Sequence, residues 1–366
     1  MTIDDNASSP NTGNIYIAWT DFNKSPHAIE FSRSTDGGTS FSRPLREISG
    51  SSGYYLAQGV CLAVGPNGTL YAAWSIYDSS TGYESAIGFN KSTDGGKTWG
   101  TPKRLSIQAF SGIRGHLNKG TEIRVQSFPS MDVDRSSGPN RGKIYIVWDN
   151  ATNTTSHTYP YIYCISSADS GADWSSKVQV NDDNSQTDKW EPWVHVDSQG
   201  GVDVVFYDSR IDPTNNVQTQ VYIGRSTDGG ASFQNYQVSD VAFTPSQVPN
   251  TAPGYMGDYL GITSMGDLII PCWNDNRTGH QQAYAARVFP DSLSGTITSN
   301  RTLDGAYRVT SNVSVSSNAT LTIDAGTILG FASGKELTVE PGSKITANGT
   351  SSQPIRFQRL DPSQAW

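Results

Sequence analysis

The 366-residue sequence has few charged residues and no long apolar run. Charged residues make up 16% of the chain, well below the ~25% that is typical of soluble domains. The 26 basic residues do not cluster and are outnumbered by 34 acidic ones, so the net charge is −8. We therefore expect no nucleic-acid partner. No segment approaches the ~18 consecutive apolar residues of a membrane helix, so no membrane span is expected.

Cysteine and histidine are also scarce. Cys61, Cys164 and Cys272 are far apart, and each lies in an apolar, strand-like run. We expect small buried hydrophobic side chains here rather than a disulfide or a metal pair. The histidines are scattered along the chain. The sequence therefore predicts no metal centre built on cysteine or histidine.

Glycine is abundant, with 36 residues, and an octet of the form Ser-x-Asp-x-Gly-x-x-aromatic occurs four times. This pattern is typical of a turn between strands: the aspartate accepts hydrogen bonds from following N–H groups, and the glycine supplies a positive φ. The aromatic ring is expected to pack into the core. The octet aspartates are therefore predicted to be structural rather than catalytic; they are Asp36, Asp94, Asp169 and Asp228.

Strand-like segments flank every octet and define a larger module. The segment Met1–Trp19 is similar to Met131–Trp148, and each is an apolar strand, a turn with glycine and a second strand. Adding the strands around each octet gives about four strands per module, which predicts the blades of a β-propeller. The modules extend to about residue 48 and then over roughly 57–107, 127–180, 190–240 and 255–289, the last without an octet or a fourth strand.

The sequence changes character after about Ser292. Apolar pairs recur there after 16 and then 18 residues, at Leu321 and Ile323, Leu337 and Val339, and Ile355 and Phe357. This spacing predicts about two coils of a parallel β-helix that continues beyond Trp366. A β-sandwich of the carbohydrate-binding type is the alternative. We expect two domains, a propeller over 1–290 and a β-helix-like segment over 291–366.

The octets resemble the Asp boxes, or BNR repeats, of the sialidase-like (neuraminidase-like) propellers. The phrases IYIAWTD, VVFYDSR and GDYLGI resemble secreted bacterial or archaeal members. This resemblance covers about residues 1–290 and implies an all-β propeller with six blades, of which about five are visible and the N-terminal part is incomplete. It further implies an extracellular or cell-surface protein with a glycan or glycoconjugate partner. The tail resembles the start of a right-handed parallel β-helix.

Candidate site residues lie on the loops that enter first strands or join second to third strands. If each blade runs from its inner to its outer strand, these loops share the face opposite the octets. Carboxylates and aromatic rings suit a sugar, and arginine grips a carboxylate at two points. The candidates are Arg124, Trp190, Glu191, Asp208, Arg210, Asp258, Tyr259, Asp275 and Arg277.

The resemblance also implies roles for these residues. A sialidase uses a tyrosine nucleophile made basic by a glutamate, and three arginines that hold the substrate carboxylate. By position, Tyr259 is similar to the nucleophile and Glu191 to its glutamate, while Arg210, Arg277 and Arg124 are similar to the arginines. The order departs from the family, because Tyr259 precedes Arg277 and no Arg-Ile-Pro motif is present.

Plainer interpretations remain open. Asp208 with Arg210 and Asp275 with Arg277 share an Asp-x-Arg spacing that is also typical of a salt bridge pinning a loop. The acidic stretch Asn181–Glu191 could hold Ca²⁺ or be a solvated loop, and no other cofactor is expected.

Two functions follow from these residues. The first is an extracellular exo-α-sialidase-like glycoside hydrolase acting on terminal acidic sugars. The alternative is a non-catalytic surface propeller that binds glycan or protein. Convergence of Arg210, Arg277, Glu191 and Tyr259 near the propeller axis would favour hydrolysis, whereas arginines held by neighbouring aspartates would favour binding.

Overall fold

The computed structural model describes residues 1–43, 45–50, 56–78, 80–115, 117, 123–266 and 268–361. Over these ranges the regular structure is entirely β-strand. The chain divides into two units, each described by itself below. The first comprises Met1–Val196, Gly200–Ile262 and Pro271–Ala286, and the second comprises Asp197–Gln199, Thr263–Ile270 and Arg287–Trp366.

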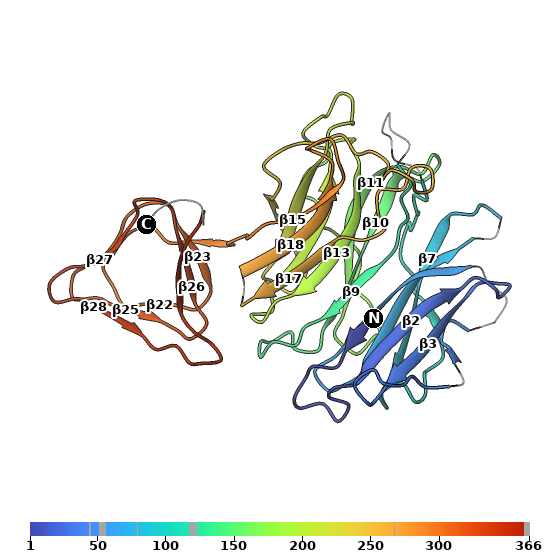
Figure 1. The fold of residues 1–366 in the computed structure, drawn as a ribbon, viewed down its shortest axis with the longest axis horizontal. Helices are drawn as coiled ribbons and strands as arrows, with labels where there is room; N and C mark the ends of the chain where they lie inside the picture. Colours follow the sequence, from blue (N-terminus) through green and yellow to red (C-terminus); the bar gives the residue numbers. More distant parts are fainter. Residues whose placement is uncertain are drawn as a thin grey trace. The chain divides into compact units, whose positions relative to one another are not determined.

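Antiparallel four-stranded sheets with strands in chain order make up the first unit (Figure 1). A three-stranded sheet follows them along the chain, and its residues 263–265 and 268–270 belong to the second unit. The sheets are β1 (Thr2–Ile3), β2 (Ile15–Asp21), β3 (Ala28–Ser34) and β4 (Arg46–Glu47); β5 (Ala57–Val64), β6 (Leu70–Tyr77), β7 (Glu84–Ser92) and β8 (Lys103–Arg104); β9 (Ser130–Val133), β10 (Ile144–Asn153), β11 (Thr158–Ser167) and β12 (Val178–Gln179); β13 (Lys189–Val196), β14 (Val202–Asp208), β15 (Gln220–Ser226) and β16 (Gln234–Gln237); and β17 (Gly261–Met265), β18 (Leu268–Asp275) and β19 (Gln282–Ala285).

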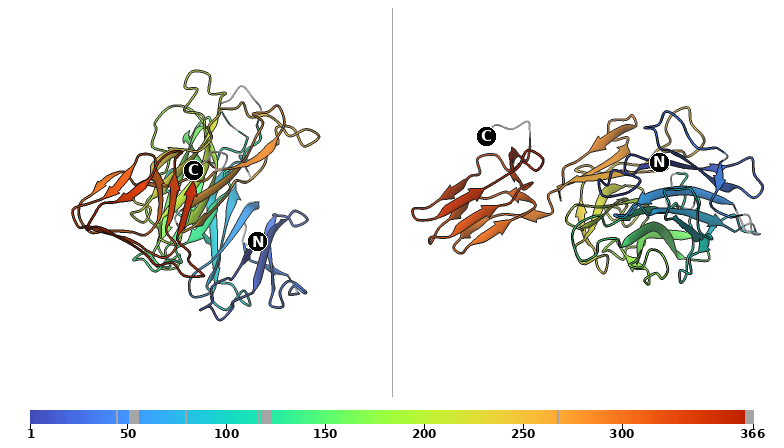
Figure 2. Two further views of the ribbon diagram at one scale, coloured as in Figure 1. Left: turned by 60° about the vertical axis from the view of Figure 1, so that its left-hand side comes forward. Right: turned by 90° about the horizontal axis from the view of Figure 1, so that it is seen from below.

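The first strands of successive sheets lie against one another. β1 contacts β5, β5 contacts β9, and β9 contacts β13. In the right-hand view of Figure 2, the sheets of this unit follow one another side by side in the colour order of the chain. Apolar side chains fill the space between neighbouring sheets, for example Ile87 and Phe89 of β7 with Ile144 and Ile146 of β10. Burial of these faces drives the stacking. The predicted all-β propeller is confirmed, with a fifth sheet of three strands, as the missing octet indicated.

Each octet forms the turn after the third strand of its sheet. In the first octet the Ser34 hydroxyl donates to Asp36 Oδ1 over 2.7 Å, and Gly38 N donates to Ser34 Oγ over 2.9 Å. The other three octets repeat both bonds. The hydrogen bond from Ser40, with that from Ser34, lowers the pKa of Asp36 to about 2. The octet aspartates accept hydrogen bonds from their own turns, as predicted.

The octets also join neighbouring sheets, which the sequence did not indicate. Trp174 of the third octet meets the Phe89 ring of the preceding sheet edge-to-face at 5.1 Å. Lys91 Nζ of that sheet donates to the Ser170 carbonyl over 2.8 Å. The Phe31 ring and Arg33 make the same two contacts to the second octet. At the fourth octet, Lys143 Nζ donates to the Gly229 carbonyl over 2.7 Å, and the Tyr145 ring lies beside Gly230. Each of these three octets is therefore a contact between neighbouring sheets as well as a turn.

Two expectations about burial are wrong. Phe41 of the first octet is 39% exposed, whereas Trp99 and Trp174 of the next two octets each meet a ring of a neighbouring sheet. Cys272 is exposed, whereas Cys61 and Cys164 are buried. Every position of β14, the second strand of the fourth sheet, is buried. The equivalent strand of the three-stranded sheet, β18, has exposed and half-buried positions, and Cys272 is its exposed one.

From Asp291 on, the second unit forms a parallel β-helix with three faces. Strands of each face pair in parallel register, and their apolar side chains, such as Leu303, Val313 and Leu321, form one core. The faces are β20 (Asp291–Ser292), β23 (Ala306–Val309), β26 (Ile328–Phe331) and β29 (Arg356–Arg359); β21 (Gly295–Ile297), β24 (Val313–Val315) and β27 (Leu337–Val339); and β22 (Arg301–Leu303), β25 (Thr320–Ile323) and β28 (Lys344–Ala347).

The predicted coil period was wrong. The apolar pairs that begin at Leu321, Leu337 and Ile355 lie on or beside strands of three different faces. Leu321 pairs with Arg301 and Ile345, and Leu337 pairs with Val313, so Leu321 and Leu337 are not partners. The 16- and 18-residue spacings therefore separate faces rather than coils, since one coil contains three strands. The parallel pairing also excludes the β-sandwich alternative, whose sheets are antiparallel.

Candidate functional site

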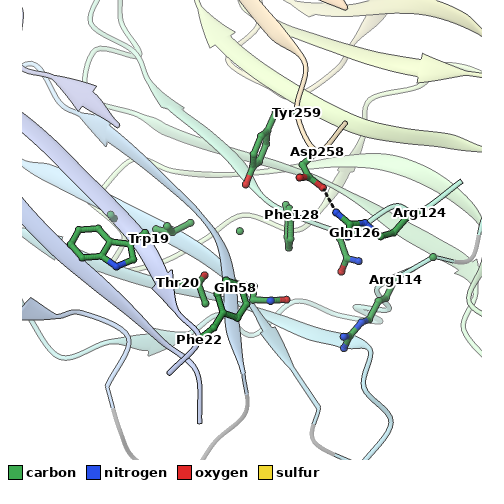
Figure 3. Close-up of a pocket in the computed structure, with 14 residues that line it drawn as sticks. Trp19, Thr20, Phe22, Gln58, Arg114, Arg124, Gln126, Phe128, Asp258 and Tyr259 are labelled. Atoms are coloured by element: carbon green, nitrogen blue, oxygen red, sulfur yellow. Dashed lines mark hydrogen bonds and ion pairs between the residues drawn. The ribbon is translucent and has the colours of Figure 1, made fainter. Parts of the chain in front are cut away.

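A cavity of about 800 Å³ opens in the first unit, where second strands end and first strands begin. The octets follow third strands and lie at the other end of the sheets. Figure 3 shows the cavity with two arginines, a carboxylate and aromatic rings around it. The size is within the range usual for small-molecule sites. Its charged and aromatic lining residues are Trp19, Phe22, Arg114, Arg124, Phe128, Asp258 and Tyr259.

Arg124 and Arg114 supply the positive charge of the cavity. Arg124 Nη2 lies 3.2 Å from Asp258 Oδ1, and its guanidinium carbon lies 4.9 Å from the centre of the Tyr255 ring. The Arg114 guanidinium lies 4.9 Å from the centre of the Tyr77 ring and donates to a backbone carbonyl. The Arg124 side chain is 43% exposed. Each guanidinium carries five N–H donors, so both can bind an anion from solvent while keeping these contacts.

Aromatic rings line the same cavity. Tyr259 is 54% exposed, stacks on Phe128 at 6.2 Å and meets Trp193 edge-to-face at 5.4 Å. Burial of part of the ring, with the neighbouring Asp258 charge, raises the pKa of Tyr259 to about 12. Phe22, at the end of the second strand of the first sheet, is 61% exposed. These faces are available for stacking on a sugar ring.

Glu191 lies behind this wall in a strained backbone conformation. β13 has a bulge between Trp190 and Trp193, and Glu191 within it has φ 50°. The equivalent bulge of β5 contains Gly59, with φ 66°. Glycine adopts this conformation freely, whereas a side chain there costs ~1–3 kcal/mol.

The Glu191 side chain is also buried. Burial, with the charges of Asp149 and Asp258, raises the pKa of Glu191 well above its usual range, and Arg124 opposes this. Glu191 thus combines a buried carboxyl with a strained backbone, and it lies next to the Arg124–Asp258 pair. Both features destabilise the fold, and their combination is typical of a functional position.

Asp149 is a second buried carboxyl beside Glu191. Its Oδ2 accepts the Glu191 backbone N–H over 3.0 Å. Burial is the largest effect on this group, and the nearby charge of Glu84 adds to it, so the pKa of Asp149 rises to about 7. The carboxyl therefore changes charge near neutral pH.

Replacing Asp149 by asparagine should change how stability depends on pH. Between about pH 4 and pH 7 the folded protein binds the Asp149 proton more tightly than the unfolded chain, so the wild type loses stability as pH rises. We expect Asp149→Asn to be more stable than wild type by roughly 2–4 kcal/mol at pH 8 and about equal at pH 4. Urea unfolding across this range measures the difference, with Asp173→Asn on an exposed turn as control. Parallel pH profiles of wild type and Asp149→Asn would contradict the buried titration.

The predicted site residues do not all share the cavity. Arg124, Asp258 and Tyr259 line it, and Glu191 lies behind it. Five others lie outside its lining: Trp190, Asp208, Arg210, Asp275 and Arg277. Arg210, Arg277, Glu191 and Tyr259 therefore do not share one opening.

Arg210 and Arg277 are held by aspartates. Arg210 Nη2 lies 2.7 Å from the buried Asp208 Oδ2, and Nη1 lies 2.6 Å from Asp182 Oδ1. Arg277 Nη2 lies 2.7 Å from the buried Asp275 Oδ2, and Nη1 pairs with Asp240. The salt bridges of the Asp-x-Arg alternative are present, and these residues pin loops in this structure.

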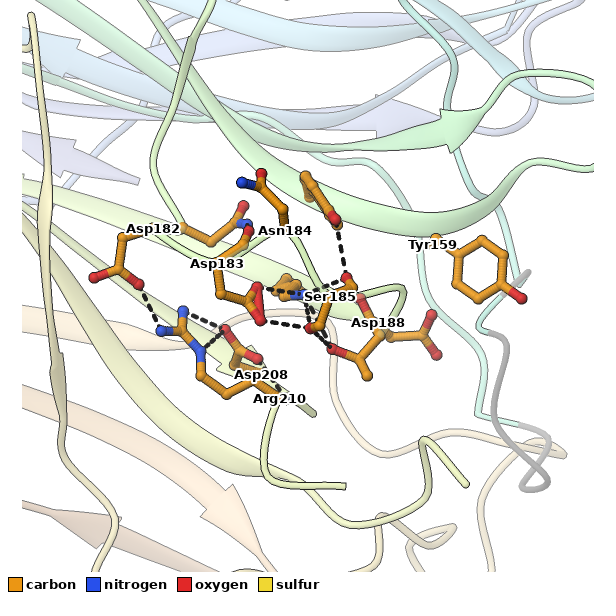
Figure 4. Close-up of polar contacts among 12 residues, drawn as sticks. Tyr159, Asp182, Asp183, Asn184, Ser185, Asp188, Asp208 and Arg210 are labelled. Atoms are coloured by element: carbon orange, nitrogen blue, oxygen red, sulfur yellow. Dashed lines mark hydrogen bonds and ion pairs between the residues drawn. The ribbon is translucent and has the colours of Figure 1, made fainter. Parts of the chain in front are cut away.

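The stretch Asn181–Glu191 folds around the side chain of Lys189. Figure 4 shows Asp182, Asp183 and Ser185 of this stretch close to Asp208 and Arg210. Lys189 is fully buried, and its Nζ lies 2.7 Å from Asp183 Oδ1. It also donates to the carbonyl and hydroxyl oxygens of Ser185 and Thr187 over 3.0–3.1 Å. From the sequence we consider this stretch as a Ca²⁺ site, but in the structure these oxygens surround the Lys189 ammonium group. In the part of the chain that the structure describes, no group of three or more His, Cys, Asp or Glu side chains is placed to hold a metal ion. Calcium binding stays a prediction.

Several cavity residues were missed from the sequence. Arg114 and Phe128 lie on the segment that enters the third sheet, beside Arg124, so the rule that selected Arg124 also covers them. Trp19 and Phe22 lie where β2 meets the second-to-third connection of the first sheet. Nothing in the sequence signalled which loops would share one opening.

Comparisons with known proteins find partial similarity. Residues 295–363 match the family model of a pectate-lyase-like β-helix domain. No curated protein sequence matches significantly. In the described part of the chain, no helix is long and apolar enough to cross a membrane.

Solved structures resemble the chain at low identity. A protein of unknown function from Dyadobacter fermentans is 17% identical over 75% of each chain, with a TM-score of 0.48. A Hadza microbial sialidase is 16% identical over 71% of this chain and 52% of its own, with a TM-score of 0.45, so the match spans about half of that sialidase. An α-L-arabinofuranosidase of Fusarium graminearum is 14% identical over 75% of this chain and 89% of its own, with a TM-score of 0.46. At these values the similarity carries no argument about activity.

Proposed function

We propose that the first unit is a glycan-recognition propeller that binds an acidic sugar in the cavity between Arg114, Arg124 and Tyr259. One observation carries the proposal: two arginines and four aromatic side chains line a single cavity of about 800 Å³. Guanidinium groups bind a sugar carboxylate at two points, and aromatic faces stack on the ring. An extracellular location and a glycoconjugate partner fit this function and stay predictions.

The rest of the lining supports a polar, ring-shaped ligand. The amide side chains of Gln58 and Gln126 line the cavity and can exchange hydrogen bonds with hydroxyl groups. Asp258 accepts from Arg124 and is itself partly exposed, so it can also accept from a sugar hydroxyl. A mixed apolar and polar cavity with few charged groups is usual for small-ligand sites.

A second candidate function is sialidase-like hydrolysis. It is favoured by Tyr259 and Asp258, which lie together on the cavity wall, and by strained Glu191 behind them. Tyrosine would attack the anomeric carbon and a carboxyl would protonate the leaving oxygen. The raised pKa of Tyr259 opposes attack unless a base takes its proton. Recognition is therefore the first function that we propose.

Titration with sialyllactose and with lactose tests recognition. We expect wild type to bind the acidic sugar, and Arg124→Gln to weaken that binding by roughly ten- to a hundredfold, because a charge-assisted contact is lost. Arg46→Gln, on an exposed strand outside the cavity, is the matched control. Equal affinity of wild type for both sugars, or an unchanged affinity in Arg124→Gln, would reject the proposal.

A fluorogenic sialoside tests hydrolysis in the same protein. Turnover that Tyr259→Phe abolishes would establish the second candidate. Binding without turnover leaves recognition as the function.

A further inference from the structure

Two arginine-bearing segments of the cavity wall meet at one buried carboxyl, that of Glu84. Glu84 is the first residue of β7 and is 1% exposed. Its Oε2 accepts the backbone N–H of Arg114 over 3.2 Å, and its Oε1 accepts the backbone N–H of Ser127 over 3.1 Å. Its carbonyl accepts from Gly112 N over 3.0 Å. One side chain therefore ties together the segments 111–115 and 123–128.

The Glu84 side chain is closely packed against Gly112. A Cβ added at Gly112 would lie 2.3 Å from Glu84 Oε2 and 2.8 Å from the Glu84 carbonyl oxygen. Glycine is required at Gly112 because the segment approaches the carboxyl so closely.

The opposite strand contributes a second contact to the same wall. The Tyr77 hydroxyl, on β6 beside Glu84, donates to Gln126 Oε1 over 2.8 Å, and the Tyr77 ring lies under the Arg114 guanidinium. Arg114, Gln126 and Phe128 all line the cavity. The positions of Arg114 and Gln126 are therefore set from β6 and β7.

We propose that Glu84 is a positioning residue that fixes the Arg114 segment against the Arg124–Phe128 segment at the separation that an acidic sugar requires. This inference rests on the proposed function. Glu84 touches no ligand itself, since it accepts backbone N–H groups behind the wall. Glu84 confers selectivity for acidic over neutral sugars by placing the two guanidinium groups. The aromatic side chains of the cavity keep their positions when Glu84 is replaced. Loss of Glu84 should therefore weaken acidic sugars more than neutral ones.

Glu84→Gln tests the inference, because glutamine keeps the shape but places an NH₂ group against a backbone N–H donor. We expect its affinity for sialyllactose to fall about tenfold or more, and its affinity for lactose by less than about threefold. Glu84→Asp, which keeps both acceptor oxygens, should retain part of the selectivity. Gly112→Ala, which leaves Glu84 in place but pushes the segment away, should behave like Glu84→Gln. Glu47→Gln, on an exposed strand, is the control.

Hydrogen exchange separates this inference from the proposed function. The amide protons of Arg114 and Ser127 should exchange faster in Glu84→Gln than in wild type, with or without sugar. If wild type binds no acidic sugar, the proposed function fails even where these amides respond. If wild type binds and Glu84→Gln lowers both affinities equally, or changes neither, Glu84 does not set selectivity and the inference is wrong.

Discussion

Lys189→Met should lower the free energy of unfolding of the first unit by roughly 3–5 kcal/mol, the usual cost of breaking a buried ion pair. Lys189 is fully buried, and its ammonium group compensates the Asp183 carboxylate and four further oxygens of Ser185 and Thr187. Methionine fills the volume but offers no donor, so the Asp183 carboxylate loses its ion pair and the other four oxygens each lose one hydrogen bond.

The measurement is urea unfolding followed by tryptophan fluorescence. Eight of the nine tryptophans precede residue 287, so the signal reports the first unit. Lys97→Met, on the exposed turn of the second octet, is the matched control and should change stability by less than about 0.5 kcal/mol. An effect of Lys189→Met below about 1 kcal/mol would show that the ammonium group does not organise the loop.

Gly171→Ala should destabilise the first unit by roughly 2–3 kcal/mol more than Gly38→Ala, although both glycines hold the same position of the octet. Both have positive φ, 81° and 91°, so the backbone strain of alanine is similar in the two variants. They differ in what the new methyl group meets. At Gly171 it would lie 2.2 Å from the Phe89 ring of the preceding sheet, whereas at Gly38 the nearest atom is Ile15 Cδ1 at 3.4 Å.

Gly96→Ala extends this comparison, since its methyl group would lie 2.6 Å from the Phe31 ring. It should resemble Gly171→Ala. Equal losses at Gly38 and Gly171 would mean that the octets stabilise only their own turns. A larger loss at Gly171 supports their role between blades.

The repeated octet made most of the fold predictable. Its serine, aspartate and glycine interact within eight residues, so the turn follows from local chemistry, and four copies mark successive sheets. The β-helix coil length was not predictable in this way. Leu321 and Leu337 look alike in sequence, and only the pairing of β25 with β28 and of β24 with β27 shows that they lie on different faces.

The candidate site was predictable only in part. Arg124 and Arg210 are both arginines on loops at the same end of the sheets, yet one lines the cavity and the other is held by Asp208 and Asp182. The sequence left the contact with Asp208, two residues away, as one alternative, but it gave no sign of the contact with Asp182, 28 residues away. The role of Glu84 was hidden for the same reason, because its partners at Arg114 and Ser127 are backbone groups 30 and 43 residues away.

A crystal structure of the protein soaked with sialyllactose tests the central claim most directly. The account predicts that the sugar carboxylate lies within hydrogen-bond distance of Arg124 or Arg114, with the ring against Tyr259 or Phe128. A carboxylate bound instead at Arg210 or Arg277, with their aspartates displaced, would contradict it.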